Sequence, residues 1–195
     1  CKNIEGFYNL SKLSSFASLD GFYYVPRVDK KLIKLYCKGL IALTGSIYGD
    51  IPNLILNVGE QQAEKEFKWW LDVFGDDFYV QINRHNLEEE EHVNNVLISF
   101  AKKYNVPIVA TNNVYYLNKD DSDAHDILLC VKEGELKSTP KGKGRGYRYG
   151  LSGNEYYFKS PQEMQILFSD LPHSIDNISS LIDKIEVFDL NREVL

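Results

Sequence analysis

Three short apolar runs in the sequence are each followed by polar residues that could do chemistry. These polar groups stand at Thr44–Ser46, Asn83–His85 and Thr111–Tyr115. In parallel α/β folds, ligands bind where the carboxyl ends of the strands meet the loops, so the groups predict a polar cleft on one rim of a sheet or barrel. A metal centre there would need converging carboxylates, imidazoles or thiolates. The rim offers hydroxyls, amides, Arg84 and a single imidazole, His85, which predicts a cleft poor in metal ligands.

A second candidate metal group surrounds His125. Three aspartates precede it, at Asp120, Asp121 and Asp123. Carboxylates beside an imidazole suit a divalent cation, but the same residues also suit a polar helix start, with Asn118 or Asp120 as the cap. We favour the helix start, and both interpretations stay open at the level of sequence.

A basic stretch between Lys132 and Gly150 carries a local charge of +4, against −10 for the rest of the chain. Its glycine-rich part contains four cations, Lys141, Lys143, Arg145 and Arg148, with Tyr147 and Tyr149 beside them. Cations and aromatic rings on a loop could contact a nucleic-acid strand, although a solvated loop explains the stretch at least as well. Because the body is acidic, the overall charge argues against a general DNA-binding protein.

The elements that would position these residues alternate between strand and helix. Apolar runs at 40–43, 78–82 and 106–110 have strand length, and the first and third read as strands covered on both faces. Apolar residues at helical spacing predict helices over 60–74 and 88–104, the second opening on four solvated glutamates, Glu88 to Glu91. Ser160–Glu163 predicts a capped helix start, 156–158 a short strand and 134–153 an exposed loop. The order predicts an α/β fold with parallel strands.

Composition limits the class of protein. The chain has 22 basic and 28 acidic side chains, which gives a net charge of −6. Its length of 195 residues is typical of one domain, or of one domain and part of another. No apolar run approaches the length of a membrane span, so no membrane partner is expected. Three widely spaced cysteines predict a reducing cytoplasm. The first residue is not Met, so we expect a segment of a longer polypeptide.

Short motifs in the sequence resemble those of a known family over nearly the whole chain. The matching segments are Glu5–Leu10, Lys12–Ser15, Gly21–Tyr24, Pro26–Asp29, Gly39–Leu43, Phe74–Asp76, Ala110–Asn112, Asp123–Cys130, Tyr157–Pro161 and Leu167–Pro172. Together they resemble the PHP domain of bacterial DNA polymerase III alpha subunits. The resemblance implies part of a distorted seven-stranded (βα)7 barrel. Residues 1–195 would then be one partial PHP domain, its later two-thirds, ending just before the polymerase palm.

The same resemblance implies a dismantled metal site. Where the family often has Ser-Gly-Cys, this sequence has Thr-Gly-Ser at 44–46, so Ser46 replaces the cysteine. Where the family often has Asn-Asp-Val-His-Tyr, this sequence has Asn-Asn-Val-Tyr-Tyr at 112–116, so Asn113 replaces the aspartate and Tyr115 the histidine. Each change replaces a good ligand by a neutral one, and losing an inner-shell anion weakens a site for hard metals. We therefore expect no metal and no cofactor in this segment, and Mg²⁺ only in the parent polymerase domain. The family's early His-x-His would lie upstream of Cys1.

The resemblance implies a DNA replication role for the parent chain, a DNA-directed DNA polymerase and so a nucleotidyltransferase. We expect the segment itself to be an inactive structural and docking domain. Its partners would be the rest of the alpha subunit, a proofreading exonuclease subunit, and DNA in the parent assembly. Two alternatives stay open: a metal-dependent phosphoesterase or 3′–5′ exonuclease using upstream histidines with His85 or His125, and DNA contact through the basic loop 141–148.

Overall fold

The computed structural model describes residues 1–142 and 144–190. In chain order the elements are α1 (Ile4–Leu19), α2 (Lys30–Tyr36), β1 (Ala42–Leu43), α3 (Asp50–Asn57), α4 (Glu60–Phe74), the 3-10 turn Gly75–Asp77, β2 (Phe78–Ile82), α5 (Glu88–Tyr104), β3 (Ile108–Ala110), the 3-10 turn Lys119–Asp121, α6 (Ser122–Glu133), α7 (Pro161–Leu167) and α8 (His173–Ile182). Within the described residues, none of these helices is long and apolar enough to cross a membrane.

The predicted α/β class is confirmed. Three parallel strands form one sheet in the order β1-β2-β3, with Ala42 opposite Phe78 and Ile82 opposite Ala110. Helices α3 and α4 connect β1 to β2, and α5 connects β2 to β3, as crossovers between parallel strands. Both predicted helices, 60–74 and 88–104, have the expected bounds.

One face of the sheet is buried in an apolar core. Residues of β2 alternate, so Phe78, Val80 and Ile82 point into this core. Phe67 of α4 and Leu97 of α5 meet them there, and both side chains have no exposed surface. The opposite face of β2 carries Tyr79 and Gln81, which leaves it polar toward the carboxyl end of the strand.

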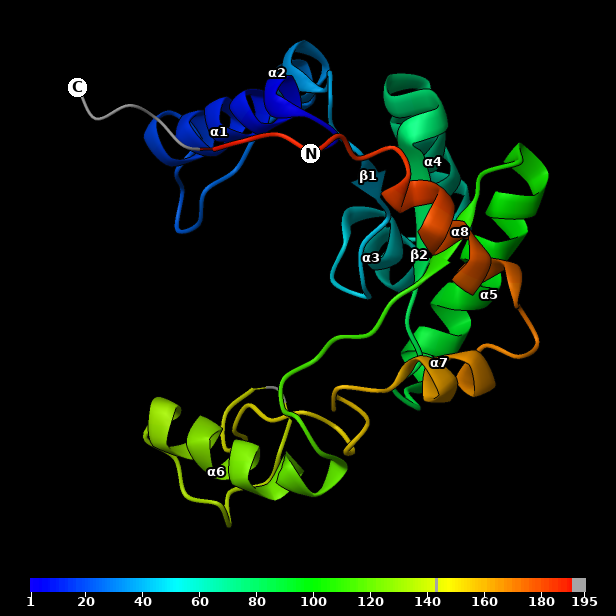
Figure 1. Cartoon of the computed structure of the whole chain (residues 1–195). Helices are drawn as coiled ribbons and strands as arrows, with labels where there is room; N and C mark the ends of the chain where they lie inside the picture. Colours follow the sequence, from blue (N-terminus) through cyan, green and yellow to red (C-terminus); the bar gives the residue numbers. More distant parts are fainter. Residues whose placement is uncertain (143, 191–195) are drawn as a thin grey trace.

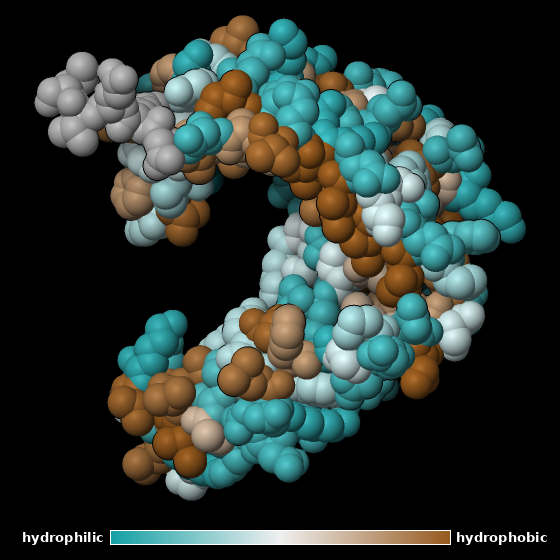
Figure 2. All heavy atoms as spheres, viewed as in Figure 1, coloured by the Kyte–Doolittle hydropathy of each residue, from teal (hydrophilic) through white to brown (hydrophobic). Residues whose placement is uncertain are grey.

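The molecule has the outline of a crescent (Figures 1 and 2). The sheet and its helices form the middle, α1 and α2 form one arm, and α6 with the loop that follows it forms the other arm. We call these the α1–α2 arm and the α6 arm. The space-filling view shows a deep hollow between the two arms, on the side away from α5.

Some local predictions need correction. The strand expected at 156–158 is a single parallel bridge between Tyr116 and Tyr157. The first apolar run is not covered on both faces, because Leu43 at the edge of the sheet is 43% exposed. The loop 134–153 has neither helix nor strand among its described residues and is mostly exposed, as predicted. Its exception is Arg148, discussed below.

Candidate functional site

The carboxyl ends of the three strands do converge, and their polar side chains bind one another. The Thr44 hydroxyl accepts a hydrogen bond from the Gln81 backbone N–H at 2.9 Å, which ties β1 to β2. The Gln81 side-chain amide donates to the Thr111 hydroxyl at 2.9 Å, which ties β2 to the end of β3. Asn83 also donates to Thr111, at 2.9 Å. The predicted rim therefore exists, but its hydroxyls and amides are already engaged within it.

His85 lies beyond the end of β2 and is almost fully buried, with 1% of its surface exposed. Its Nδ1 is 2.7 Å from a carboxylate oxygen of Glu90, and its backbone N–H donates to the other oxygen at 2.6 Å. Glu90 itself is 4% exposed. The carboxylate therefore holds both the ring and the backbone of His85, across the turn that starts α5.

The other ring nitrogen of His85 is also engaged. Its Nε2 is 3.1 Å from the side-chain oxygen of Asn112, while the Asn112 amide donates to the Tyr157 carbonyl at 2.8 Å. The backbone N–H of Asn113 points at the same Nε2, at 3.3 Å. The Tyr156 ring stacks on the imidazole, with centroids 4.4 Å apart and planes 10° from parallel. Protein groups thus surround the imidazole on both nitrogens and one ring face.

Tyr156 is the residue through which the α6 arm reaches this imidazole. Burial raises the pKa of its hydroxyl to about 12, and the nearby Glu90 carboxylate adds to the shift. Tyr115 packs its ring edge against Tyr156 at 5.7 Å and lies 5.7 Å from the ring of His125. The result is an aromatic cluster of Tyr156, Tyr115 and His125 beside the His85 ring.

The three residues predicted to stand where ligands were lost have different surroundings. Asn113 and Tyr115 join the cluster around His85, the first through its backbone and the second through its ring. Ser46 lies in the turn between β1 and α3, where its carbonyl accepts from the Gly49 N–H at 2.7 Å.

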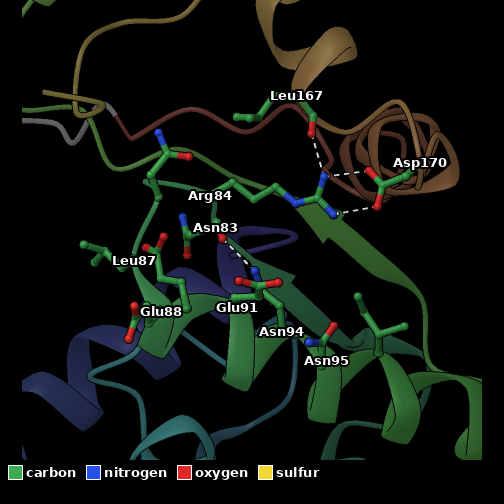
Figure 3. Close-up of a pocket in the computed structure, with 12 residues that line it drawn as sticks. Asn83, Arg84, Leu87, Glu88, Glu91, Asn94, Asn95, Leu167 and Asp170 are labelled. Carbon is green, nitrogen blue, oxygen red and sulfur yellow. Dashed lines mark hydrogen bonds and ion pairs between the residues drawn. The ribbon is translucent and has the colours of Figure 1, made fainter. Parts of the chain in front are cut away.

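Arg84 is a structural clamp. Figure 3 shows its guanidinium turned toward Asp170, to which it makes two hydrogen bonds of 2.6 and 2.8 Å. It also donates to the Leu167 carbonyl at 2.6 Å and lies 4.7 Å above the ring of Phe168. Bonding to the carboxylate raises the pKa of Arg84 and lowers that of Asp170. Arg84 therefore fastens the end of β2 to the segment between α7 and α8.

A pocket of about 580 Å³ lies beside this clamp, between the start of α5 and α7 (Figure 3). Glu88 and Glu91 line it together with Asn94, whose amide donates to the Asn83 carbonyl at 2.8 Å. Its carboxylates would repel anions, and it holds no histidine or cysteine.

His125 lies in α6 as part of a helix start, which confirms the interpretation we favoured. Asn118 and Asp121 form a reciprocal capping box at the 3-10 turn that precedes α6. Asp123 pairs with Lys137, and the His125 ring packs 5.5 Å from Tyr116. Asp121 and Asp123 thus have structural partners.

The basic loop requires a correction at Arg148. This side chain is 4% exposed, and its guanidinium makes two 2.8 Å bonds to the Asp126 carboxylate. It also donates to the Thr139 carbonyl at 2.9 Å. Lys141 reaches the same carboxylate at 3.0 Å. Arg148 is therefore not available to a nucleic acid, and the prediction for it was wrong, because a buried carboxylate on α6 captures it.

The other two cations of that loop differ from Arg148. Arg145 is exposed and stays a predicted nucleic-acid contact. Lys143 lies outside the described residues.

The rim does not fit a metal ion. In the part of the chain that the structure describes, no three His, Cys, Asp or Glu side chains gather in a group that could hold one. The imidazole nearest the predicted site, His85, has hydrogen-bond partners at both nitrogens. Both carboxylate oxygens of the neighbouring Glu90 bond to His85. The donors left over are neutral amides and phenols, which bind divalent cations weakly without an anionic ligand.

Sequence reasoning missed Glu90, Tyr156 and Asp126. Glu90 was placed among four solvated glutamates, and its burial contradicts that. The i to i+5 spacing from His85 across a helix start could have suggested the pair. The contact between Tyr156 and His85 spans 71 positions, and no local pattern signals it.

Comparison with known families supports the resemblance over the first part of the chain. Residues 1–85 match the PHP domain family, which confirms the resemblance seen in the sequence. The matched region includes the α1–α2 arm, β1, β2 and His85.

Relatives extend the similarity to almost the whole chain. The chain is 38% identical to DNA polymerase III subunit alpha of Borreliella burgdorferi, over 96% of its own length and 16% of that protein. Identity is 37% to the subunit of Thermus aquaticus, over 87% of this chain and 13% of that protein. It is 33% to that of Chlamydia pneumoniae, over 99% of this chain and 18% of that protein. The chain thus spans less than a fifth of the length of these relatives.

Proposed function

We propose that this chain is a PHP-domain segment of a replicative bacterial DNA polymerase III alpha subunit, and that it serves as a metal-free structural and docking domain. The observation that carries the metal-free role is the engagement of His85, which bonds to Glu90 through Nδ1 and to Asn112 through Nε2. Both ring nitrogens lie against protein groups, so a metal ion would have to displace Asn112 and Asn113 to reach the ring. The segment then contributes shape and contacts, and no phosphoester hydrolysis.

The finer architecture is part of this proposal. The three-stranded parallel sheet would be a portion of a distorted seven-stranded barrel, and residues 1–195 would be one partial domain that ends before the palm. The hollow between the two arms, and the polar end of β2 at Gln81, each suit the interior of such a barrel.

The partners follow from the same placement. We propose the rest of the alpha subunit, the proofreading exonuclease subunit and, in the parent assembly, DNA, all in the cytoplasm. Nucleotidyl transfer with Mg²⁺ would belong to other parts of the parent chain, since the described residues bring no three or more His, Cys, Asp or Glu side chains together for a metal ion.

Metal analysis of the complete parent polypeptide tests the metal-free role. We expect less than stoichiometric zinc, manganese or iron after purification without chelator, and no chelator-sensitive nuclease activity. A triple variant that restores the family's ligands, Ser46→Cys, Asn113→Asp and Tyr115→His, is the matched control and should bind more metal. Stoichiometric metal in the unmodified protein, with nuclease activity abolished by chelation, would instead establish the phosphoesterase alternative.

Calorimetry tests the docking role separately. The complete polypeptide should bind the proofreading exonuclease of the same source, and the affinity should not change when metal is added or removed. Absence of binding would remove the docking role while leaving the metal-free site intact.

A further inference from the structure

The loop between α1 and α2 is an exposed aromatic hairpin. Residues 22–31 are all exposed, and Tyr24 at the tip has 84% of its surface open. Phe22, Tyr23 and Val25 around it are each more than half exposed. Figure 1 shows this loop hanging from the α1–α2 arm on the side that faces the α6 arm. We call residues 21–29 the aromatic hairpin.

The hairpin is held in one shape by its own contacts. A side chain at Gly21 would collide with the Arg27 carbonyl, only 1.9 Å from the position of its Cβ, so glycine closes the base. Tyr23 pairs with Val25 in an antiparallel bridge, which places Tyr24 at a φ of +62°. The Arg27 guanidinium lies 4.8 Å from the centroid of the Tyr23 ring. The Tyr24 ring packs edge-on against Tyr23 with centroids 4.7 Å apart, so it loses little freedom when a ligand stacks on it.

The α1–α2 arm carries more cations than carboxylates, although Lys2 and Lys30 pair with Asp77 and Glu66 outside it. Residues 1–40 contain seven basic and three acidic side chains, a net charge of +4, whereas residues 50–104 carry a net charge of −6. In the described part of the chain no ion pair holds Arg27, Lys31 or Lys34. Lys34 lies 6.0 Å from the ring of Trp69 and remains exposed.

The acidic middle of the crescent does not cancel this charge. Interactions between exposed charges fade over about 10 Å at 0.1 M salt. The hairpin lies at the tip of its arm, while the glutamates that open α5 lie in the middle of the crescent (Figure 1). Where α2 meets α4, the Glu66 carboxylate pairs with Lys30 at 2.5 Å, so an anionic ligand meets the cations that no ion pair holds among the described residues, Arg27, Lys31 and Lys34.

We propose that the aromatic hairpin and the start of α2 form a binding site for single-stranded nucleic acid. Phe22 and Tyr24 offer open ring faces on which bases stack, and Arg27, Lys31 and Lys34 contact the phosphates. Bases stack on aromatic rings without regard to sequence, while phosphates require separate cations, and the hairpin supplies both. An acidic peptide could use the cations but would leave the rings without partners. The site is independent of the proposed metal-free role.

Fluorescence anisotropy with a labelled 20-nucleotide oligothymidylate tests the site, using the complete 195-residue chain at 50 mM salt. We expect Phe22→Ser combined with Tyr24→Asn to weaken binding by about tenfold or more, because base stacking is removed. Asn tolerates the positive φ at position 24, so the fold should persist, and circular dichroism checks this. The slope of log K against log salt should not change in this variant.

The charge variant gives the complementary result. Replacing Arg27, Lys31 and Lys34 by Gln should reduce the salt slope by about 2, at roughly 0.7 for each phosphate that the cations no longer neutralise. The matched control replaces Lys65, Lys68 and Lys102 by Gln, which removes the same charge from the acidic middle and should leave the slope unchanged. An equal reduction in the control, no binding by the unmodified chain, or tighter binding of a polyglutamate peptide through the same residues would each overturn the proposal.

Discussion

The middle of the crescent and the α6 arm are stabilised by different forces. In the middle, large apolar side chains such as Phe67, Phe78 and Leu97 pack together with almost no exposed surface. In the α6 arm the buried groups include Asp126, Arg148 and Lys159, and the apolar contribution comes from a few rings and Cys130.

Because of this difference, the two regions should respond differently to pH. Apolar burial is insensitive to pH, whereas an ion pair fails when one partner is neutralised. Bonding to Arg148 holds the pKa of the Asp126 carboxyl far below its usual range. We therefore expect the arm to loosen under conditions in which the middle of the crescent stays folded.

The largest effect should come from the apolar core. Phe67→Ala removes a fully buried ring that lies 5.1 Å from Phe78 and 5.5 Å from Phe100, and it should lower the free energy of unfolding by about 3–5 kcal/mol. Urea titration followed by circular dichroism measures this. Phe158→Ala, at an exposed ring, is the control and should change the midpoint little. Similar losses in the two variants would contradict the placement of the core.

The second-largest effect should come from the junction between the two regions, where Glu90 holds the His85 ring on which Tyr156 of the α6 arm stacks. Glu90→Ala leaves the backbone N–H and the Nδ1 of His85 without their acceptor, and this should destabilise the protein by about 2 kcal/mol. The exposed neighbour Glu89→Ala is the matched control. Urea titration compares them, and a Glu90→Ala midpoint equal to that of the control would show that the carboxylate does not hold His85.

The ion pair of the α6 arm should rank third, with a local effect. Asp126→Asn keeps the shape of the side chain and removes the charge that holds Arg148 and Lys141, so limited proteolysis within 134–153 should accelerate by roughly tenfold. Asp123→Asn, whose side chain is mostly exposed, serves as the control. Faster cleavage in the middle of the crescent as well would mean that the two regions are not separable.

Acid should produce the smallest effect and act on the same pair. A carboxyl whose folded pKa is lowered stabilises the fold above its unfolded pKa of about 3.9 and loses that contribution as the pH falls below it. Hydrogen exchange at residues 139–149, corrected for intrinsic rates, should rise between pH 5 and pH 3, while β2 stays protected. Equal protection of the loop at both pH values would exclude Asp126 as its anchor.

The local part of the molecule was predictable because its signals are local. The period of apolar residues set the bounds of α4 and α5, and Ser160 with Glu163 marked the start of α7 through a capping box that the structure contains. Short apolar runs indicated the strands, and their parallel order followed from the helices between them. The polar rim was also predictable, since parallel strands bring their carboxyl ends to one edge.

The partners of charged side chains were decided by tertiary structure alone. Glu90 and its solvated neighbour Glu89 have the same side chain, and only packing against His85 distinguishes them. Arg148 and Arg145 stand in the same glycine-rich loop, yet Asp126 captures the first and leaves the second in solvent. The periodicity of a helix depends on neighbours within a few residues, whereas the partner of a charge depends on which distant segment the fold brings beside it.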